Sequence, residues 1–195
     1  MELQEDKARL IEEIFVDKVY DVYPELTVID CGANIGLYTE FIHPKAKAVY
    51  AIEPSTRNYQ LLSERVRNKD LTKVLTLNMG LSDSVGEVPL YKRVSYGGFS
   101  IIGGAPENNE VEEMVKVTTL ANFMYDTDIS HADILKIDIE GAEQRVFSSP
   151  DFKDVAGRIE LIIGEIHGGC EIEEILKSNG FSYEVKDRIF LAKRI

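Results

Sequence analysis

The sequence contains no apolar run long enough to cross a bilayer. Its first segment, MELQEDKARLIEEIF, begins with charged side chains and lacks the basic-then-apolar order of a secretory signal peptide. We therefore expect a cytoplasmic protein without a membrane-spanning segment.

Cysteine is also scarce, with only two residues in the chain. Cys31 stands inside an apolar, strand-like run, and Cys170 follows a pair of glycines much later in the chain. Two residues at this separation match neither a disulfide framework nor a metal-ligand motif. We expect two free thiols, and neither a disulfide nor a zinc site.

Basic side chains are fewer than acidic ones. The chain has 22 Lys and Arg residues against 34 Asp and Glu residues, which gives a formal net charge of −12. A field of this sign opposes long-range attraction of a phosphate backbone, so nucleic acid is a poor candidate partner. A local basic cluster is spaced as on the solvated face of a helix. Its members are Arg57, Arg65, Arg67 and Lys69.

The length and the apolar pattern predict one α/β domain over residues 1–195. With 195 residues, 44% of them hydrophobic, the chain can bury one sizeable core. Apolar residues at helical spacing over residues 3–22 predict a leading amphipathic helix within residues 1–24. Strand-like and helix-like segments then alternate, which predicts parallel strands joined by crossover helices.

This alternation predicts a Rossmann-like, three-layer sandwich with about seven mostly parallel strands and an antiparallel C-terminal hairpin. A hairpin and loop insertion is expected over residues 84–119, in which a glycine-rich stretch, residues 95–106, predicts a mobile lid. Ser55 is the expected N-cap of one helix. The expected strands cover residues 26–32, 47–54, 73–80, 132–140 and 158–167, and the expected helices cover residues 35–43, 55–68, 141–148 and 171–179.

The clearest local motif is VIDCGANIG, an apolar strand that runs into a glycine turn and then a helix. A dinucleotide site needs G-x-G-x-x-G, whereas Gly32 and Gly36 are spaced as G-x-x-x-G. Asp30 at the strand end would repel a pyrophosphate but could hold an ammonium group, directly or through water. The motif therefore favours S-adenosylmethionine over a dinucleotide, with a purely structural turn as the alternative.

The next two strands also end in polar residues. Glu53 and Pro54 end the second strand, where an acid can accept hydrogen bonds from both ribose hydroxyls. Ser82 and Asp83 follow the third strand and could reach an adenine ring, although an ordinary turn explains them equally well.

The segment LKIDIE predicts a cluster of ionisable groups. Strict alternation would place Lys136, Asp138 and Glu140 on one face of a central strand, which is costly unless the groups are paired or used. A buried ion pair is the alternative to a site.

His167 follows the fifth strand, beside two glycines, where an imidazole could take a proton from a hydroxyl. We predict His167 as the general base, followed by Asp138 or Lys136. Asp138 and neighbouring acids could bind a divalent cation that lowers the pKa of a hydroxyl, but no ligand spacing demands one, and we expect no metal.

The segments VIDCGANIGLYT, AIEPS, NMGLSD, LKIDIEGAE and IGEIH, in this order, resemble the FkbM-type methyltransferases, a family of class I S-adenosylmethionine enzymes. The resemblance spans roughly residues 26–170. It implies S-adenosylmethionine as cofactor and methyl transfer to a hydroxyl of a small molecule or glycan. Methylation of RNA or protein and non-catalytic cofactor binding remain as alternatives.

The resemblance also implies roles for single residues. Asp138 and Glu140 would lie nearest the transferred methyl, Glu53 at the ribose and Asp83 near the adenine. The cofactor's amino acid end would be held by the turn that contains Asp30, Gly32, Ala33, Asn34 and Gly36.

Overall fold

The computed structural model describes residues 25–92, 99–103, 110–167 and 171–195. The expected leading helix, Cys170 and much of the expected lid therefore lie outside the described residues. Seven strands form the main sheet: β1 (Leu26–Cys31), β2 (Ala46–Ile52), β3 (Val74–Leu77), β8 (Ala132–Ile137), β9 (Ile159–Glu165), β10 (Glu184–Lys186) and β11 (Ile189–Lys193).

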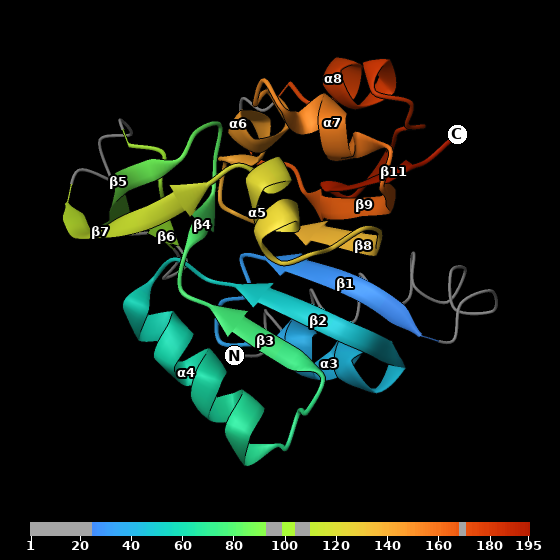
Figure 1. Cartoon of the computed structure of the whole chain (residues 1–195). Helices are drawn as coiled ribbons and strands as arrows, with labels where there is room; N and C mark the ends of the chain where they lie inside the picture. The colour runs from blue at the N-terminus through green and yellow to red at the C-terminus, as the bar shows by residue number, and fades with distance from the viewer. Residues whose placement is uncertain (1–24, 93–98, 104–109, 168–170) are drawn as a thin grey trace.

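The order of these strands is β10-β11-β9-β8-β1-β2-β3 (Figure 1). Strands β1, β2, β3, β8 and β9 pair in parallel, whereas β11 pairs antiparallel to both β9 and β10. The predicted Rossmann-like architecture with an antiparallel C-terminal hairpin is confirmed. Because the chain adds strands on one side of β1 and later on the other, the strand order reverses between β1 and β8. Ligands of open α/β sheets bind in the crevice at such a point, beyond the carboxyl ends of the strands.

Helices cover both faces of this sheet (Figure 1). They are α3 (Leu37–Ile42), α4 (Thr56–Asn68), α5 (Leu120–Asp126), α6 (Glu143–Phe147), α7 (Phe152–Ala156) and α8 (Glu173–Ser178), with a 3-10 turn at His43–Lys45. Ser55 is the N-cap of α4, as predicted, and its hydroxyl accepts a hydrogen bond from the Asn58 backbone N–H at 3.4 Å. Among the described residues, no helix is long and apolar enough to span a membrane.

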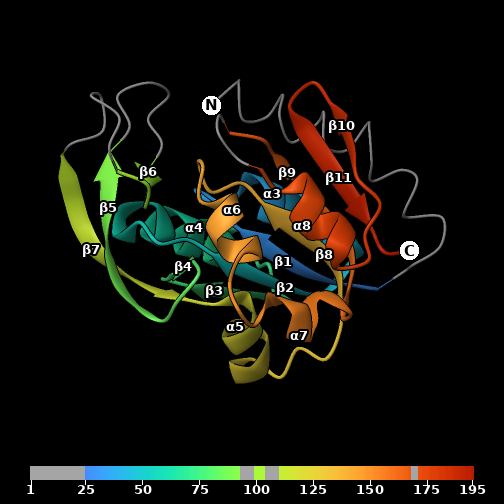
Figure 2. The same ribbon diagram turned by 90° about the horizontal axis from the view of Figure 1, so that it is seen from above.

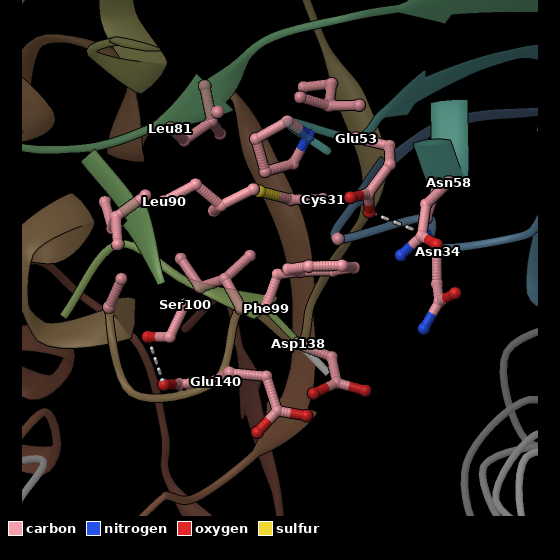
Figure 3. A pocket seen from close by; sticks show the side chains of 18 of the residues that line it. Cys31, Asn34, Glu53, Asn58, Leu81, Leu90, Phe99, Ser100, Asp138 and Glu140 are labelled. Carbon is pink, nitrogen blue, oxygen red and sulfur yellow. Dashed lines mark hydrogen bonds between the residues drawn. The ribbon is translucent and has the colours of Figure 1, made fainter. Parts of the chain in front are cut away.

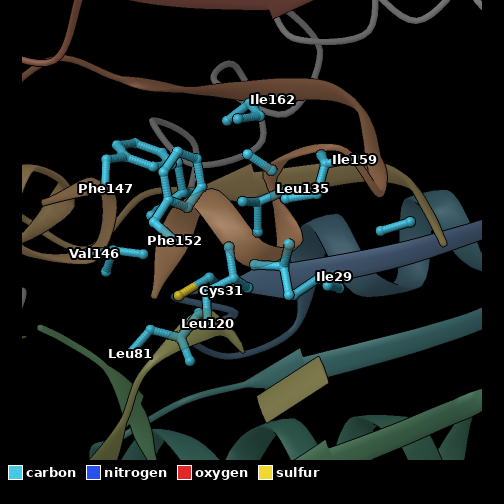
Figure 4. Close-up of a cluster of buried hydrophobic side chains, with 14 of the residues drawn as sticks. Ile29, Cys31, Leu81, Leu120, Leu135, Val146, Phe147, Phe152, Ile159 and Ile162 are labelled. Atoms are coloured by element: carbon cyan, nitrogen blue, oxygen red, sulfur yellow. The ribbon is translucent and has the colours of Figure 1, made fainter. Parts of the chain in front are cut away.

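The two faces of β1 contribute to different cores because successive side chains point to opposite sides of a sheet. Ile29 and Cys31 belong to the larger cluster, which includes Phe147 and Phe152 from α6 and α7 (Figure 4). Val28 points the other way and packs in a cluster with residues of α3. A strand buried on both faces needs this nearly continuous apolar sequence.

A second, four-stranded sheet lies beyond the carboxyl ends of the main strands (Figures 1 and 2). Its order is β4-β7-β5-β6, with β4 (Gly80–Leu81), β5 (Gly86–Lys92), β6 (Phe99–Ser100) and β7 (Val111–Thr118). Strands β5 and β7 pair antiparallel within the region where a hairpin was expected. Of the expected lid the structure describes residues 99–103, in which Phe99–Ser100 form β6 and Ile101 is buried in a cluster that contains Leu90 and Val115.

Candidate active site

A cavity opens where the strand order reverses, between the ends of β1 and β8 and the second sheet (Figure 3). One part of its wall is polar and mostly acidic, and the opposite part is apolar. The polar part includes Asn34, Glu53, Asn58, Asp138 and Glu140. The apolar part includes Leu81, Leu90 and Phe99. Ile101 also lines the cavity.

The turn after β1 requires glycine because the chain passes directly against another backbone segment. Gly32 has φ 77°, and a Cβ there would lie 1.9 Å from the Asp138 carbonyl oxygen. The N–H groups of Gly32 and Ala33 both donate to the Ile52 carbonyl, at 3.0 and 2.9 Å. Gly32, Ala33 and Asn34 consequently line the cavity. Gly36 does not line it, and packs against Leu62 of α4, where a Cβ would lie 2.6 Å from Leu62 Cδ1.

Glu53 stands at the end of β2 with its carboxylate buried in the cavity wall. Its two oxygens accept hydrogen bonds from the backbone N–H groups of Asn34 and Ser55, each at 2.9 Å. Burial disfavours the charged form and raises the pKa of Glu53 to about 7, although the two hydrogen bonds and Lys136 act in the opposite direction. The carboxylate is thus held in one orientation and would gain from further hydrogen-bond donors in the cavity.

Asp30 and Lys136 form a buried ion pair under the cavity. Their strands place them directly opposite each other, and Asp30 Oδ1 lies 3.1 Å from Lys136 Nζ. Asp30 Oδ2 also accepts a hydrogen bond from Thr39 Oγ1 at 2.6 Å, and Asp30 does not line the cavity. Burial disfavours the Lys136 ammonium, but Asp30 and Asp138 outweigh this and raise the lysine pKa above its usual value. A lysine held as an ammonium ion is a poor proton acceptor.

The expectation of strict alternation through residue 140 is wrong. Strand β8 ends at Ile137, and Asp138 and Glu140 lie in the following turn, where Glu140 has φ 57° and Gly141 has φ 103°. Ser100 from the second sheet fixes this turn by donating to the Glu140 carbonyl at 2.8 Å. The turn brings Asp138 and Glu140 into the cavity wall.

His167 follows β9 and is only 6% exposed. Its Nδ1 lies 3.0 Å from Glu143 Oε1, and its Nε2 lies 3.8 Å from Asp138 Oδ1 and 3.4 Å from Glu140 Oε2. Burial lowers the pKa of His167, but the three carboxylates outweigh this and raise it. The imidazole does not line the cavity, but it lies close to Asp138 and Glu140, which do.

Comparison with known proteins identifies the family. Residues 30–183 match the model of the methyltransferase FkbM domain. The chain belongs to the FkbM methyltransferase family. Methyltransferase sdnD of Sordaria araneosa is 28% identical over 210 residues, covering 88% of this chain and 81% of that protein. The 31-O-demethyl-FK506 methyltransferase FkbM of Streptomyces tacrolimicus is 26% identical over 212 residues, covering 89% and 81%.

Solved structures of methyltransferases share the fold. Methyltransferase FkbM from Methylobacillus flagellatus matches with a TM-score of 0.62 at 16% identity, over 92% of this chain and 46% of that one. The present chain therefore spans less than half of that protein. Magnesium protoporphyrin IX methyltransferase from Synechocystis, solved with bound SAM, matches with a TM-score of 0.59 at 13% identity, over 99% and 82%.

Within this FkbM family member, four expected cofactor residues lie outside the cavity wall: Asp30 and Gly36, described above, and Ser82 and Asp83. Ser82 is buried and donates to Asp83 Oδ1 at 3.1 Å, and the neighbouring Gly80 and Leu81 line the cavity instead. Sequence reasoning also missed Glu143, whose carboxylate is fully buried behind His167. The only signal for it was its place directly after LKIDIEGA, where a buried acid would need partners.

Proposed function

We propose that this methyltransferase uses S-adenosylmethionine and transfers its methyl group to a hydroxyl oxygen of a small molecule or glycan. The observation that best supports the proposal is the Glu53 carboxylate, buried in the cavity wall and held by two backbone N–H groups. An acid in this position can accept hydrogen bonds from both hydroxyls of a ribose.

The composition of the cavity wall fits this cofactor. The cofactor has no phosphate, and its sulfonium and ammonium groups are positive, so an acidic wall attracts it. The apolar wall opposite, including Leu90 and Phe99, suits the face of an adenine ring. Lys136 is the one basic side chain in the described wall, and Asp30 already neutralises it. The same acids would repel a pyrophosphate or a nucleic acid backbone, which disfavours the RNA alternative.

Bound S-adenosylmethionine supplies an electrophilic methyl group, and the protein must align the acceptor and remove its proton. Asp138 and Glu140 present carboxylates to the cavity and can accept that proton directly. His167, packed against both, is placed to stabilise the charge on them or to pass the proton on. Its assignment as the general base stays a prediction. An oxygen acceptor is also consistent with the Streptomyces tacrolimicus relative, named for 31-O-demethyl-FK506.

The test is turnover with S-adenosylmethionine labelled with carbon-13 at the methyl group. The full chain is incubated with a panel of sugars and hydroxylated natural products, and carbon NMR identifies the atom that receives the label. We expect an O-methyl resonance for at least one acceptor class. Labelled N-methyl or S-methyl products, or labelled RNA under the same conditions, would overturn the hydroxyl assignment.

A further inference from the structure

Asp138, Glu140 and His167 come together at one end of the cavity, with one ligand atom from each lying within 4.8 Å of the others. We propose that these three side chains bind a divalent metal ion through Asp138 Oδ1, Glu140 Oε2 and His167 Nε2. No spacing in the sequence indicated such a site, because residues 138 and 167 belong to different strand ends.

The distances between the ligand atoms suit a metal ion. His167 Nε2 lies 3.8 Å from Asp138 Oδ1 and 3.4 Å from Glu140 Oε2. A cation bound at about 2.1 Å by each atom requires separations of about 3.0–3.4 Å between neighbouring ligands. The separation of His167 Nε2 from Glu140 Oε2 already fits this range, whereas the other two separations, at most 4.8 Å, would have to shorten by side-chain rotation.

Glu143 prepares the imidazole for this role. Its Oε1 accepts a hydrogen bond from the Ile139 N–H at 3.0 Å and lies 3.0 Å from His167 Nδ1. A carboxylate can only accept, so Nδ1 must carry a proton, and the lone pair of a neutral imidazole is then on Nε2, which faces the two acids. A buried carboxylate behind a histidine is the arrangement that orients metal-binding imidazoles and raises their basicity.

The charges in the cluster leave a place for a cation. Asp138 Oδ1 is buried and makes no hydrogen bond to any residue that the structure describes. Three carboxylates, those of Asp138, Glu140 and Glu143, surround a single imidazole. An Nε2 lone pair facing two carboxylate oxygens is repulsive unless a positive charge lies between them. A second proton on the imidazole could also supply this positive charge. Titration with Mn²⁺ distinguishes the two arrangements.

Two oxygens and one nitrogen form a mainly hard ligand set, which suits Mn²⁺ or Mg²⁺ with open positions for water or a substrate oxygen. Asp138 and Glu140 both line the cavity, so an open position would face an acceptor hydroxyl and lower its pKa. This catalytic use rests on the proposed function, whereas the binding of the ion does not.

The experiment is a titration of the full chain with Mn²⁺, followed by the loss of the six-line EPR signal of free Mn²⁺. We expect one saturable site, with competition by Mg²⁺. His167→Gln and Glu140→Gln should each weaken binding at least about tenfold. His131→Gln is the matched control, because His131 is exposed and its Nε2 lies 3.4 Å from Asp133 Oδ1, with no third ligand among the residues that the structure describes. It should bind Mn²⁺ as the unchanged chain does.

An undiminished signal of free Mn²⁺ would overturn the proposal, as would equal affinity in His167→Gln, Glu140→Gln and the unchanged chain. Circular dichroism confirms the fold of each variant, and Glu140, with a side chain 28% exposed, offers a position that tolerates change if His167→Gln unfolds. Binding of S-adenosylhomocysteine is measured on the same samples. Cofactor binding without Mn²⁺ binding would refute the metal site alone, and Mn²⁺ binding without cofactor binding would refute the proposed function alone.

Discussion

Binding of S-adenosylhomocysteine, the demethylated product, should release a proton from Glu53. In the free protein, burial raises the pKa of this carboxyl to about 7, so near neutrality it is protonated about half the time. Ribose hydroxyls donate far better hydrogen bonds to a carboxylate than to a carboxylic acid. The ligand therefore selects the ionised form and lowers the pKa of Glu53 in the complex.

The expected size follows from the hydrogen bonds that would be gained. Hydrogen bonds to a charged acceptor contribute about 1.5–3 kcal/mol, which corresponds to a pKa decrease of about 1–2 units. Binding at pH 7 should then release about half a proton per ligand. Affinity should decrease about tenfold per pH unit below pH 7 and level off after a total loss of about 10–100-fold.

The same shift has a consequence for stability without ligand. Because the folded pKa lies above the ordinary value of 4.5, the folded state holds more protons than the unfolded state between pH 4.5 and about 7. The contribution of Glu53 to the free energy of unfolding is therefore fully present below pH 4.5 and is lost as pH rises to about 7. Saturating ligand should offset that loss.

Calorimetry in two buffers of different ionisation enthalpy, such as phosphate and Tris, measures the proton release directly. Glu53→Gln should abolish the difference between buffers and weaken binding. Glu113→Gln is a matched control, because Glu113 also accepts a backbone N–H, from Thr56 at 2.8 Å, but lies outside the cavity wall. Identical binding enthalpies in both buffers at pH 6.5, or proton release that persists in Glu53→Gln, would refute the reasoning.

Three further outcomes are expected. Gly32→Ala should lower the melting temperature strongly, because a Cβ would lie 1.9 Å from a carbonyl oxygen, whereas Gly86→Ala, with nothing within 4 Å, should change it little; similar melting temperatures would contradict this. Asp30→Asn should lower the free energy of unfolding by about 3–5 kcal/mol, because it leaves Lys136 buried without its ion-pair partner. A decrease below about 1 kcal/mol, which is typical of an exposed ion pair, would contradict this. His167→Ala should lower kcat by about 10²–10⁴ with little change in cofactor affinity, and near-native turnover would remove His167 from the reaction.

The parallel strands of the main sheet could be predicted because a run of mostly apolar residues marks each of them in the sequence. Apolar runs such as residues 26–32 and 158–167 match β1 and β9 closely, since a strand buried on both faces must be apolar throughout. Helices α5 and α7 were not predicted, although α5 is no shorter than the predicted α3; most of their residues are buried, so they form through packing against the core and lack a marked polar face. The end of β8 was placed too late because the Glu140 turn depends on Ser100, far away in sequence.

Single residues near the cavity could be picked out from the sequence, but the contacts between their side chains could not. Glu53 could be placed in the cavity wall because it ends a strand at the carboxyl edge of the sheet. Asp30 was interpreted as a cofactor ligand, whereas the structure places it opposite Lys136, a register that only strand pairing decides. The contact of His167 with Glu143 likewise joins two segments that the sequence does not relate.

The central claim is that the cavity binds S-adenosylmethionine and not a dinucleotide, and parallel calorimetric titrations of the full chain with S-adenosylhomocysteine and with NADH test it most directly. We predict saturable micromolar binding of S-adenosylhomocysteine together with a rise in melting temperature, and no response to NADH. Binding of NADH without any response to S-adenosylhomocysteine would contradict the account.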